Sequence, residues 1–154
     1  MARLVCGLIL VLLGACASFG QQSLVGTYKI ISQEVVLDGT PTYPMGKAPQ
    51  GCLVITPTRV VSFFVGENKK FGTSVAEKVG LLDALVGYGG TYRIEGGKIL
   101  ISAEASWTGV YTGRVKVRND TLSGNRLTLR AEPAPYPRDA SKTAHSVTVW
   151  EKVE

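Results

Sequence analysis

The feature that most constrains this chain is a series of short apolar runs separated by turn residues at regular intervals. The runs are rich in valine, isoleucine, leucine and tyrosine, and glycine, proline, asparagine and aspartate separate them. Such residues favour strands, and this spacing is typical of a β-sandwich or a β-barrel. We therefore expect one mainly antiparallel, all-β domain with strands at 25–37, 51–56, 59–65, 88–95, 98–106, 111–118, 121–122 with 126–131, and 143–153.

Two of the connections are predicted to be tight turns. The sequence EGGK at 95–98 offers two adjacent glycines, and SGN at 123–125 offers a third. Glycine takes the positive φ angles that a two-residue primed hairpin turn requires. The proline-rich sequence AEPAPYPRDASK at 131–142 is expected to be a long loop, because proline cannot donate a ladder hydrogen bond.

One segment, at 74–86, follows a helical rather than a strand pattern. Its apolar residues recur at helical spacing, and Ser74 and Glu77 form an S-x-x-E capping box. Gly87 provides a stop signal, and Gly80 weakens the helix by about 1 kcal/mol relative to alanine. We expect this short helix to depend on packing against the sheet, where it plugs one end of a barrel or covers a flank.

The N-terminus has the order of features found in an export signal. Arg3 supplies a short positive region, an apolar run follows at 4–15, and small residues come next. The sequence LLGAC at 12–16 resembles the lipobox of bacterial lipoproteins, in which Cys16 would become the lipidated N-terminus. Alternatively, cleavage after the A-x-A sequence at 15–17 would release a soluble protein. We expect a signal peptide at 1–22, a domain at 23–154, and export to the periplasm or cell envelope as a lipid-anchored or secreted protein.

The charge pattern gives little support to a nucleic-acid-binding function. Removing the signal removes only Arg3 among the charged residues, so the net charge falls from +5 to about +4. The alternation in RVKVR at 114–118 predicts that Val115 and Val117 face the core and that Arg114, Lys116 and Arg118 face water. This basic stripe is interpreted either as a solvated wall or as a contact for anionic lipid headgroups or an acidic partner.

The cysteines do not indicate a disulfide in the mature chain. Cys6 leaves with the signal and Cys16 is acylated or removed, so Cys52 remains alone. A nucleophilic cysteine needs a nearby base and an electropositive setting, but Cys52 lies between glycine and an apolar run. We expect it to be a small apolar strand residue.

Several stretches together resemble the bacterial and fungal lipocalin-like domain family. They are LVGTYKI at 24–30, YPMGKAPQG at 43–51, EASWTG at 104–109, GNRLTLR at 124–130 and VTVWEKV at 147–153. The resemblance implies a small closed β-barrel of about eight to ten strands, which holds side chains or one small ligand. It also gives Met45 a place as a gap-filling core residue. Relatives often carry histidines where Ile101 and Ser102 stand here, and the connection around Trp107 is shorter, so catalytic roles are not transferred.

The candidate ligand-binding residues are aromatic residues and the sole histidine. Within such a barrel, a pocket could be lined by Tyr28, Trp107, Tyr111 and His145, with Tyr88 as a further aromatic. The strand at 98–106 has two faces, and either could point to the interior. The more apolar face is favoured as the inner one, and its residues are Ile99, Ile101, Ala103 and Ala105. The other face carries Leu100, Ser102 and Glu104.

The sequence lacks the sets of residues that known chemistry needs. One histidine and one mature thiol do not make a metal site, and the phosphate-loop and G-x-S-x-G motifs are absent, so we expect no metal, no cofactor and no catalytic residue. The favoured function is non-enzymatic binding of a small, largely apolar molecule. The alternatives are an interaction protein of the envelope with a filled barrel, which presents the basic stripe or the proline-rich loop, and an isomerase or cyclase that uses His145.

Overall fold

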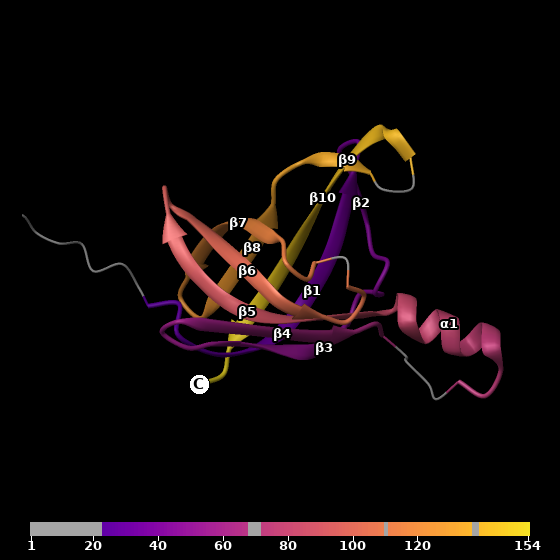
Figure 1. Ribbon diagram of the computed structural model, residues 1–154, viewed down its shortest axis with the longest axis horizontal. Coiled ribbons are helices and arrows are strands. Elements are labelled where there is room, and N and C mark those ends of the chain that lie inside the picture. The colour runs from indigo at the N-terminus through magenta and orange to yellow at the C-terminus, as the bar shows by residue number, and fades with distance from the viewer. Residues whose placement is uncertain (1–22, 68–71, 110, 137–138) are drawn as a thin grey trace, which may run out of the picture.

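The computed structural model describes residues 23–67, 72–109, 111–136 and 139–154, which form ten strands and one helix (Figure 1). In chain order these elements are β1 (Gly26–Leu37), β2 (Thr40–Thr42), β3 (Gln50–Ile55), β4 (Arg59–Val65), α1 (Val75–Asp83), β5 (Leu85–Glu95), β6 (Lys98–Ser106), β7 (Val115–Ser123), β8 (Arg126–Ala131), β9 (Ala134–Tyr136) and β10 (Asp139–Lys152). The predicted signal segment at 1–22, with Cys16, lies outside the described residues.

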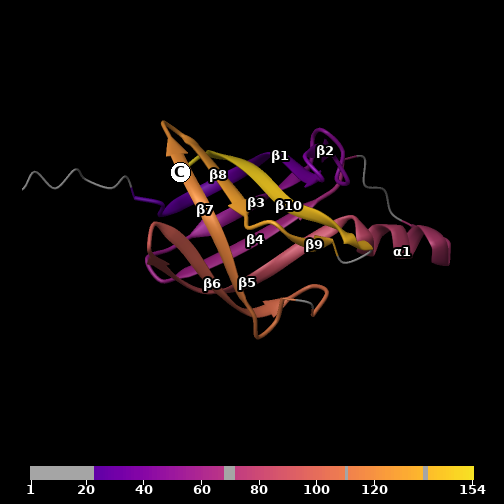
Figure 2. The ribbon, with the colours of Figure 1, turned by 90° about the horizontal axis from the view of Figure 1, so that it is seen from above.

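The sheet closes on itself to form an antiparallel barrel. Its strands follow the order β2-β1-β3-β4-β5-β6-β7-β8-β10-β9, and a further pairing of β1 with β10 joins the two sides of the sheet. Eight of the described strands therefore form a ring, while β2 and β9 extend β1 and β10 beyond it (Figure 2). Closure removes the unpaired edges that an open sheet exposes. The predicted all-β barrel is confirmed.

The strand predictions are most accurate where turns punctuate the sequence. The strands at 59–65, 98–106 and 126–131 match residue for residue, and Gly96 and Gly97 have φ angles of 58° and 74° in the hairpin between β5 and β6. Errors occur where proline obscures the pattern, and also at β7, which runs from Val115 to Ser123 where separate strands at 111–118 and 121–122 were expected. Both β2 and β9 contain a proline, Pro41 and Pro135, and neither strand was expected. The predicted proline-rich loop thus contains β9.

The core lies inside the ring and draws on most of its strands. Tyr28, Leu127 and Trp150 are almost completely buried, and the rings of Phe64 and Trp150 meet edge to face with centroids 5.7 Å apart. The Tyr28 hydroxyl donates to the carbonyl of Leu24 at 2.7 Å, so this phenol is buried with its polar atom paired. Burying each large side chain of this kind stabilises the fold by roughly 1.5–3 kcal/mol.

Strand β6 presents the expected residues to the interior, with one exception. Ile99, Ile101 and Ala103 are buried, while Glu104 is exposed and pairs with Arg59 on β4. Ala105, which was predicted to face inward, is exposed because the pairing of β5 with β6 shifts between Gly89 and Gly90. A bulge of this kind exchanges the two faces of a strand beyond it.

Helix α1 has the predicted cap but not the predicted packing. The Ser74 side chain accepts from the Glu77 amide, and the Glu77 carboxylate accepts from the Ser74 amide at 2.8 Å. However, the helix ends at Asp83, Gly87 belongs to β5, and no helical residue is buried. Val75 is 79% exposed, and the helix points away from the barrel (Figure 1). The expectation that it plugs or covers the barrel is therefore wrong.

Two smaller expectations have different outcomes. Met45 is buried in the core cluster, as a gap-filling residue should be. Cys52 is a strand residue, in β3, but its side chain is exposed on the outer surface. Of the helices in the described ranges, none has the length and hydropathy to cross a membrane.

Candidate functional site

The inner face of β7 carries charged residues. Lys116 is only 7% exposed, whereas Val115 is 52% exposed. Lys116 lies opposite Ile101 and Arg118 lies opposite Ile99, and both isoleucines are buried. Since directly paired residues on neighbouring strands share a face, Lys116 and Arg118 both face the interior. The predicted orientation of RVKVR is therefore wrong: the valines are outside, and the basic stripe does not exist.

Two tyrosines enclose the Lys116 ammonium group. Its Nζ lies 3.6 Å from the ring centroid of Tyr88 on β5, and 3.6 Å from that of Tyr111 in the connection between β6 and β7. The two rings meet at 67° with centroids 6.2 Å apart. A cation this close to aromatic faces gains electrostatic attraction, most strongly when water is excluded. We call Lys116, Tyr88, Tyr111 and Arg118 the β7 cluster.

Lys116, Tyr88 and Tyr111 lie toward the end of the barrel that bears α1, whereas Arg118 pairs with Ile99 nearer the other end. Lys116 is the second residue of β7, and this strand begins at the end where β6 finishes and β5 starts. Tyr28 lies toward the opposite end, where β1 begins and β10 finishes. The apolar core reaches both ends, with Met45 and Phe64 near α1 and Tyr28 near the other end, and the cations of β7 lie along its wall.

Burial makes the charge on Lys116 unfavourable. Desolvation, aided by the positive charge of Arg118, lowers the pKa of Lys116 from its ordinary value near 10.5 to about 6. Burial likewise raises the pKa of the Tyr88 phenol, against the opposing effect of Arg118. Both shifts have the same origin, a site from which water is largely excluded.

No carboxylate in the described residues forms an ion pair with either inner cation. The ion pairs there are Arg59–Glu104, Arg93–Glu95, Lys98–Glu132 and Lys142–Asp139, all on the surface. Arg118 Nη1 instead donates to the carbonyl of Val117 at 2.7 Å. Asp120 also lies on the inner face of β7, opposite the buried Leu129, and burial raises the pKa of its carboxyl. The inner face of β7 thus has two cations and one partly desolvated acid.

Two buried polar atoms within the described part of the chain have no well-formed hydrogen bond. They are the Ser62 hydroxyl and the Gln33 carbonyl oxygen. Ser62 lies opposite Tyr88 across β4 and β5, and its hydroxyl acts to lower the pKa of Tyr88 against the larger effect of burial. A buried polar group without a partner costs about 1–3 kcal/mol. Its presence beside the β7 cluster indicates a place for a further polar group.

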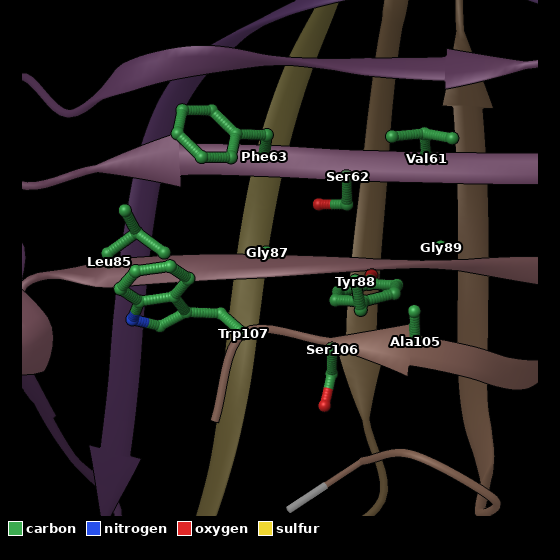
Figure 3. Close-up of a pocket in the computed structure, with 10 residues that line it drawn as sticks. All are labelled: Val61, Ser62, Phe63, Leu85, Gly87, Tyr88, Gly89, Ala105, Ser106 and Trp107. Carbon is green, nitrogen blue, oxygen red and sulfur yellow. The ribbon is translucent and has the colours of Figure 1, made fainter. Parts of the chain in front are cut away.

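An apolar groove lies on the outer wall of the barrel, and Ser62 and Tyr88 are among the residues that line it (Figure 3). The groove has a volume of about 320 Å³, and Gly87 and Gly89 of β5 lie along it. Phe63, Leu85 and Trp107 gather around Gly87, and Val61 and Ala105 lie near Gly89. Phe63 and Trp107 are 47% and 51% exposed, so this groove is open to solvent.

The predicted site residues occupy different parts of the molecule. Tyr111 belongs to the β7 cluster, Trp107 lies at the outer groove, and Tyr28 is part of the core. His145 is partly buried on β10, on the face opposite Trp150, with its Nε2 3.2 Å from Arg130 Nη1. Cys16 lies outside the described residues. Among the residues that the structure describes, no three His, Cys, Asp or Glu side chains gather as metal ligands.

Lys116, Arg118 and Ser62 were missed as residues of the candidate site in the barrel. Alternation in the sequence shows which residues of β7 share a face, but it does not show which of the two faces is buried in the core. The neighbouring sequence favoured the valines as core residues, because burial of a cation is rare. No local signal in the sequence distinguishes the two orientations.

The comparisons with known proteins agree with this architecture. A family model described as "Lipocalin-like domain" matches residues 25–153, which is nearly all of the described chain. No curated protein and no solved structure matches at a significant level.

Proposed function

Because the chain belongs to the lipocalin-like domain family, we propose that its barrel binds a small molecule with a largely apolar body and does not catalyse a reaction. The observation that carries this proposal is the β7 cluster, where Lys116 is buried with no acidic partner among the described residues. An uncompensated buried charge lowers stability, and proteins keep such groups mainly where they serve function. The apolar side chains deeper in the barrel suit the body of the ligand.

The binding site is tested with N-phenyl-1-naphthylamine, a neutral apolar dye that fluoresces when it leaves water. We expect saturable binding to the wild-type protein. Ser62→Leu adds bulk on the inner face beside Tyr88, so it should weaken binding by about tenfold, the effect of a lost interaction worth about 1.4 kcal/mol.

Gly89→Leu is the matched control, because it adds the same side chain to the outer groove. A Cβ at Gly89 meets only ordinary contacts, the nearest being Val61 Cγ2 at 3.5 Å. Dye binding should be unchanged in this variant, and circular dichroism checks that both variants fold. Loss of binding in Gly89→Leu, with retention in Ser62→Leu, would assign the dye to the outer groove and refute an interior site.

We propose further that the protein acts outside the cytoplasm, with Cys16 as a lipid attachment point. This rests on the order of charge, apolar run and lipobox in the sequence. Mass spectrometry of the protein from host membranes should show an acylated N-terminal Cys16. A free N-terminus at residue 17 or beyond would show ordinary cleavage instead, and a chain that retains Met1 would refute export.

The enzymatic alternative depends on His145, the sole histidine of the chain. Its only described polar contact is with the Arg130 guanidinium. A general base is ordinarily oriented by a carboxylate or a carbonyl, and neither contacts this imidazole among the described hydrogen bonds. Binding is therefore the better supported function.

A further inference from the structure

We propose that the ligand of the barrel is an amphipathic monoanion, whose acidic group binds Lys116 and Arg118 while its apolar body lies among the core side chains. This inference rests on the proposed binding function and names the chemical class of the ligand. It follows from the geometry of the β7 cluster and from the charges that the interior does and does not contain.

The first argument is the arrangement of the two cations. Lys116 and Arg118 are two positions apart on one strand, so their side chains leave the same face of β7 toward the interior. Like charges held together in a desolvated site repel each other, and the fold supplies no ion pair to either in its described residues. A bound anion would compensate both charges at once. Neutral ligands would leave that repulsion in place.

The second argument is the limit that the surroundings place on ligand charge. Lys116 and Arg118 supply two positive charges, and the Tyr88 and Tyr111 rings and the Ile101 side chain beside Lys116 add no third. Asp120, on the same face of β7, adds a further acid near Arg118. A group with a single negative charge, such as a carboxylate or a sulfonate, therefore fits better than a doubly charged phosphate monoester.

The third argument is the supply of neutral hydrogen-bonding groups around the cations. The buried Ser62 hydroxyl has no well-formed hydrogen bond, and it lies on β4 directly opposite Tyr88. A hydroxyl that can donate complements an anionic oxygen, and such charge-assisted hydrogen bonds are stronger than neutral ones. The cluster thus offers an ammonium, a guanidinium and a hydroxyl donor toward one region of the interior.

The test compares two dyes that differ by one charged group. Anilinonaphthalene sulfonate is N-phenyl-1-naphthylamine with an added sulfonate, so the pair isolates the contribution of the anion. At pH 6 the wild-type protein should bind the sulfonate dye more tightly than the neutral dye by about tenfold or more, as expected for a hydrogen bond to a charged group. Lys116→Met should bring the ratio of sulfonate-dye affinity to neutral-dye affinity close to one, whatever its effect on the neutral dye alone.

Arg118→Met provides a second route, since the half-buried Arg118 is easier to replace without unfolding the protein. It should also reduce the preference for the sulfonate dye. Arg114→Met is the matched control, because Arg114 is an exposed cation just before β7, and it should change neither dye. This control removes a general surface-charge effect from the comparison.

The preference should also depend on pH in a defined direction. The groups that face Lys116 are Arg118 on its own strand, Tyr88 on β5 and Tyr111, with apolar Ile101 on β6. As pH rises from 6 to about 9, Lys116 loses its proton, and binding of the sulfonate dye should weaken more than binding of the neutral dye. In Lys116→Met this pH-dependent difference should disappear.

The outcomes separate this inference from the function on which it rests. Equal affinity of the wild-type protein for both dyes, or a preference that survives in both Lys116→Met and Arg118→Met, overturns the anion site but leaves apolar binding in the barrel. Failure of the wild-type protein to bind either dye overturns the proposed function itself.

Discussion

At the scale of single residues, the burial of Lys116 sets the stability of the ligand-free fold against the binding of an anion, and no neighbouring residue in the sequence indicates this. Its ammonium group has aromatic faces on two sides but no acid to pair with in the described structure. The aromatic contacts offset only part of the desolvation cost, since the pKa of Lys116 still falls to about 6. The residue should therefore lower the stability of the ligand-free fold.

We predict that Lys116→Met stabilises the ligand-free protein at pH 6 by about 1–4 kcal/mol, the range seen when buried ions are replaced by apolar residues. The difference should shrink as pH rises toward 10. The pKa of Lys116 is near 6 in the folded protein and near 10.5 in the unfolded chain. Between these two pH values only the unfolded chain has Lys116 protonated, so the free energy of unfolding of the wild-type protein rises with pH. Urea unfolding of both proteins at several pH values measures this.

A difference between the two proteins that stays constant from pH 6 to pH 10 would contradict this prediction. It would mean that Lys116 titrates alike in the folded and unfolded states, as a solvent-exposed lysine does. The comparison with the methionine variant cancels the contributions of the other titratable groups, which are common to both proteins.

At the scale of elements, helix α1 depends on its cap because it lacks burial. No residue of the helix is buried, so its stability comes from local interactions. The Glu77 carboxylate accepts from the backbone amides of Ser74 and Thr73, and these bonds lower the pKa of Glu77 to about 2. The cap is therefore fully formed above the ordinary glutamate pKa and is lost as pH falls toward 2.

We predict that Ser74→Ala destabilises α1 locally by about 1 kcal/mol, because it removes the acceptor for the Glu77 amide. Hydrogen exchange should become faster at the amides of α1 while those of the barrel strands are unchanged. Gly80→Ala is a useful counterpart, since nothing lies within 4 Å of its added Cβ and alanine favours the helix. A fall in the global melting temperature with Ser74→Ala would show that α1 supports the barrel.

At the scale of the whole molecule, closure of the barrel decides which side chains are inside. The pairing of β1 with β10 joins segments more than a hundred residues apart, and it completes the ring around the core and the β7 cluster. The same closure leaves α1 outside, although its apolar spacing suggested a covering role. Closure also gives β4, β5 and β6 two different faces. The Ser62 and Tyr88 side chains are buried on the inner face, and Phe63 and Trp107 are exposed at the groove on the outer face.

The sequence by itself determined the local features of this protein. Turn glycines, strand-forming runs and the capping box act over a few residues, so the hairpins, most strands and the start of α1 follow from the sequence, as does the family. Only the tertiary structure decided that Lys116 lies inside and Val115 outside, that Ala105 is exposed beyond a bulge, and that α1 has no buried residue. Alternation along a strand defines two faces, but burial of one of them depends on partners distant in the sequence, and no local pattern contains that information.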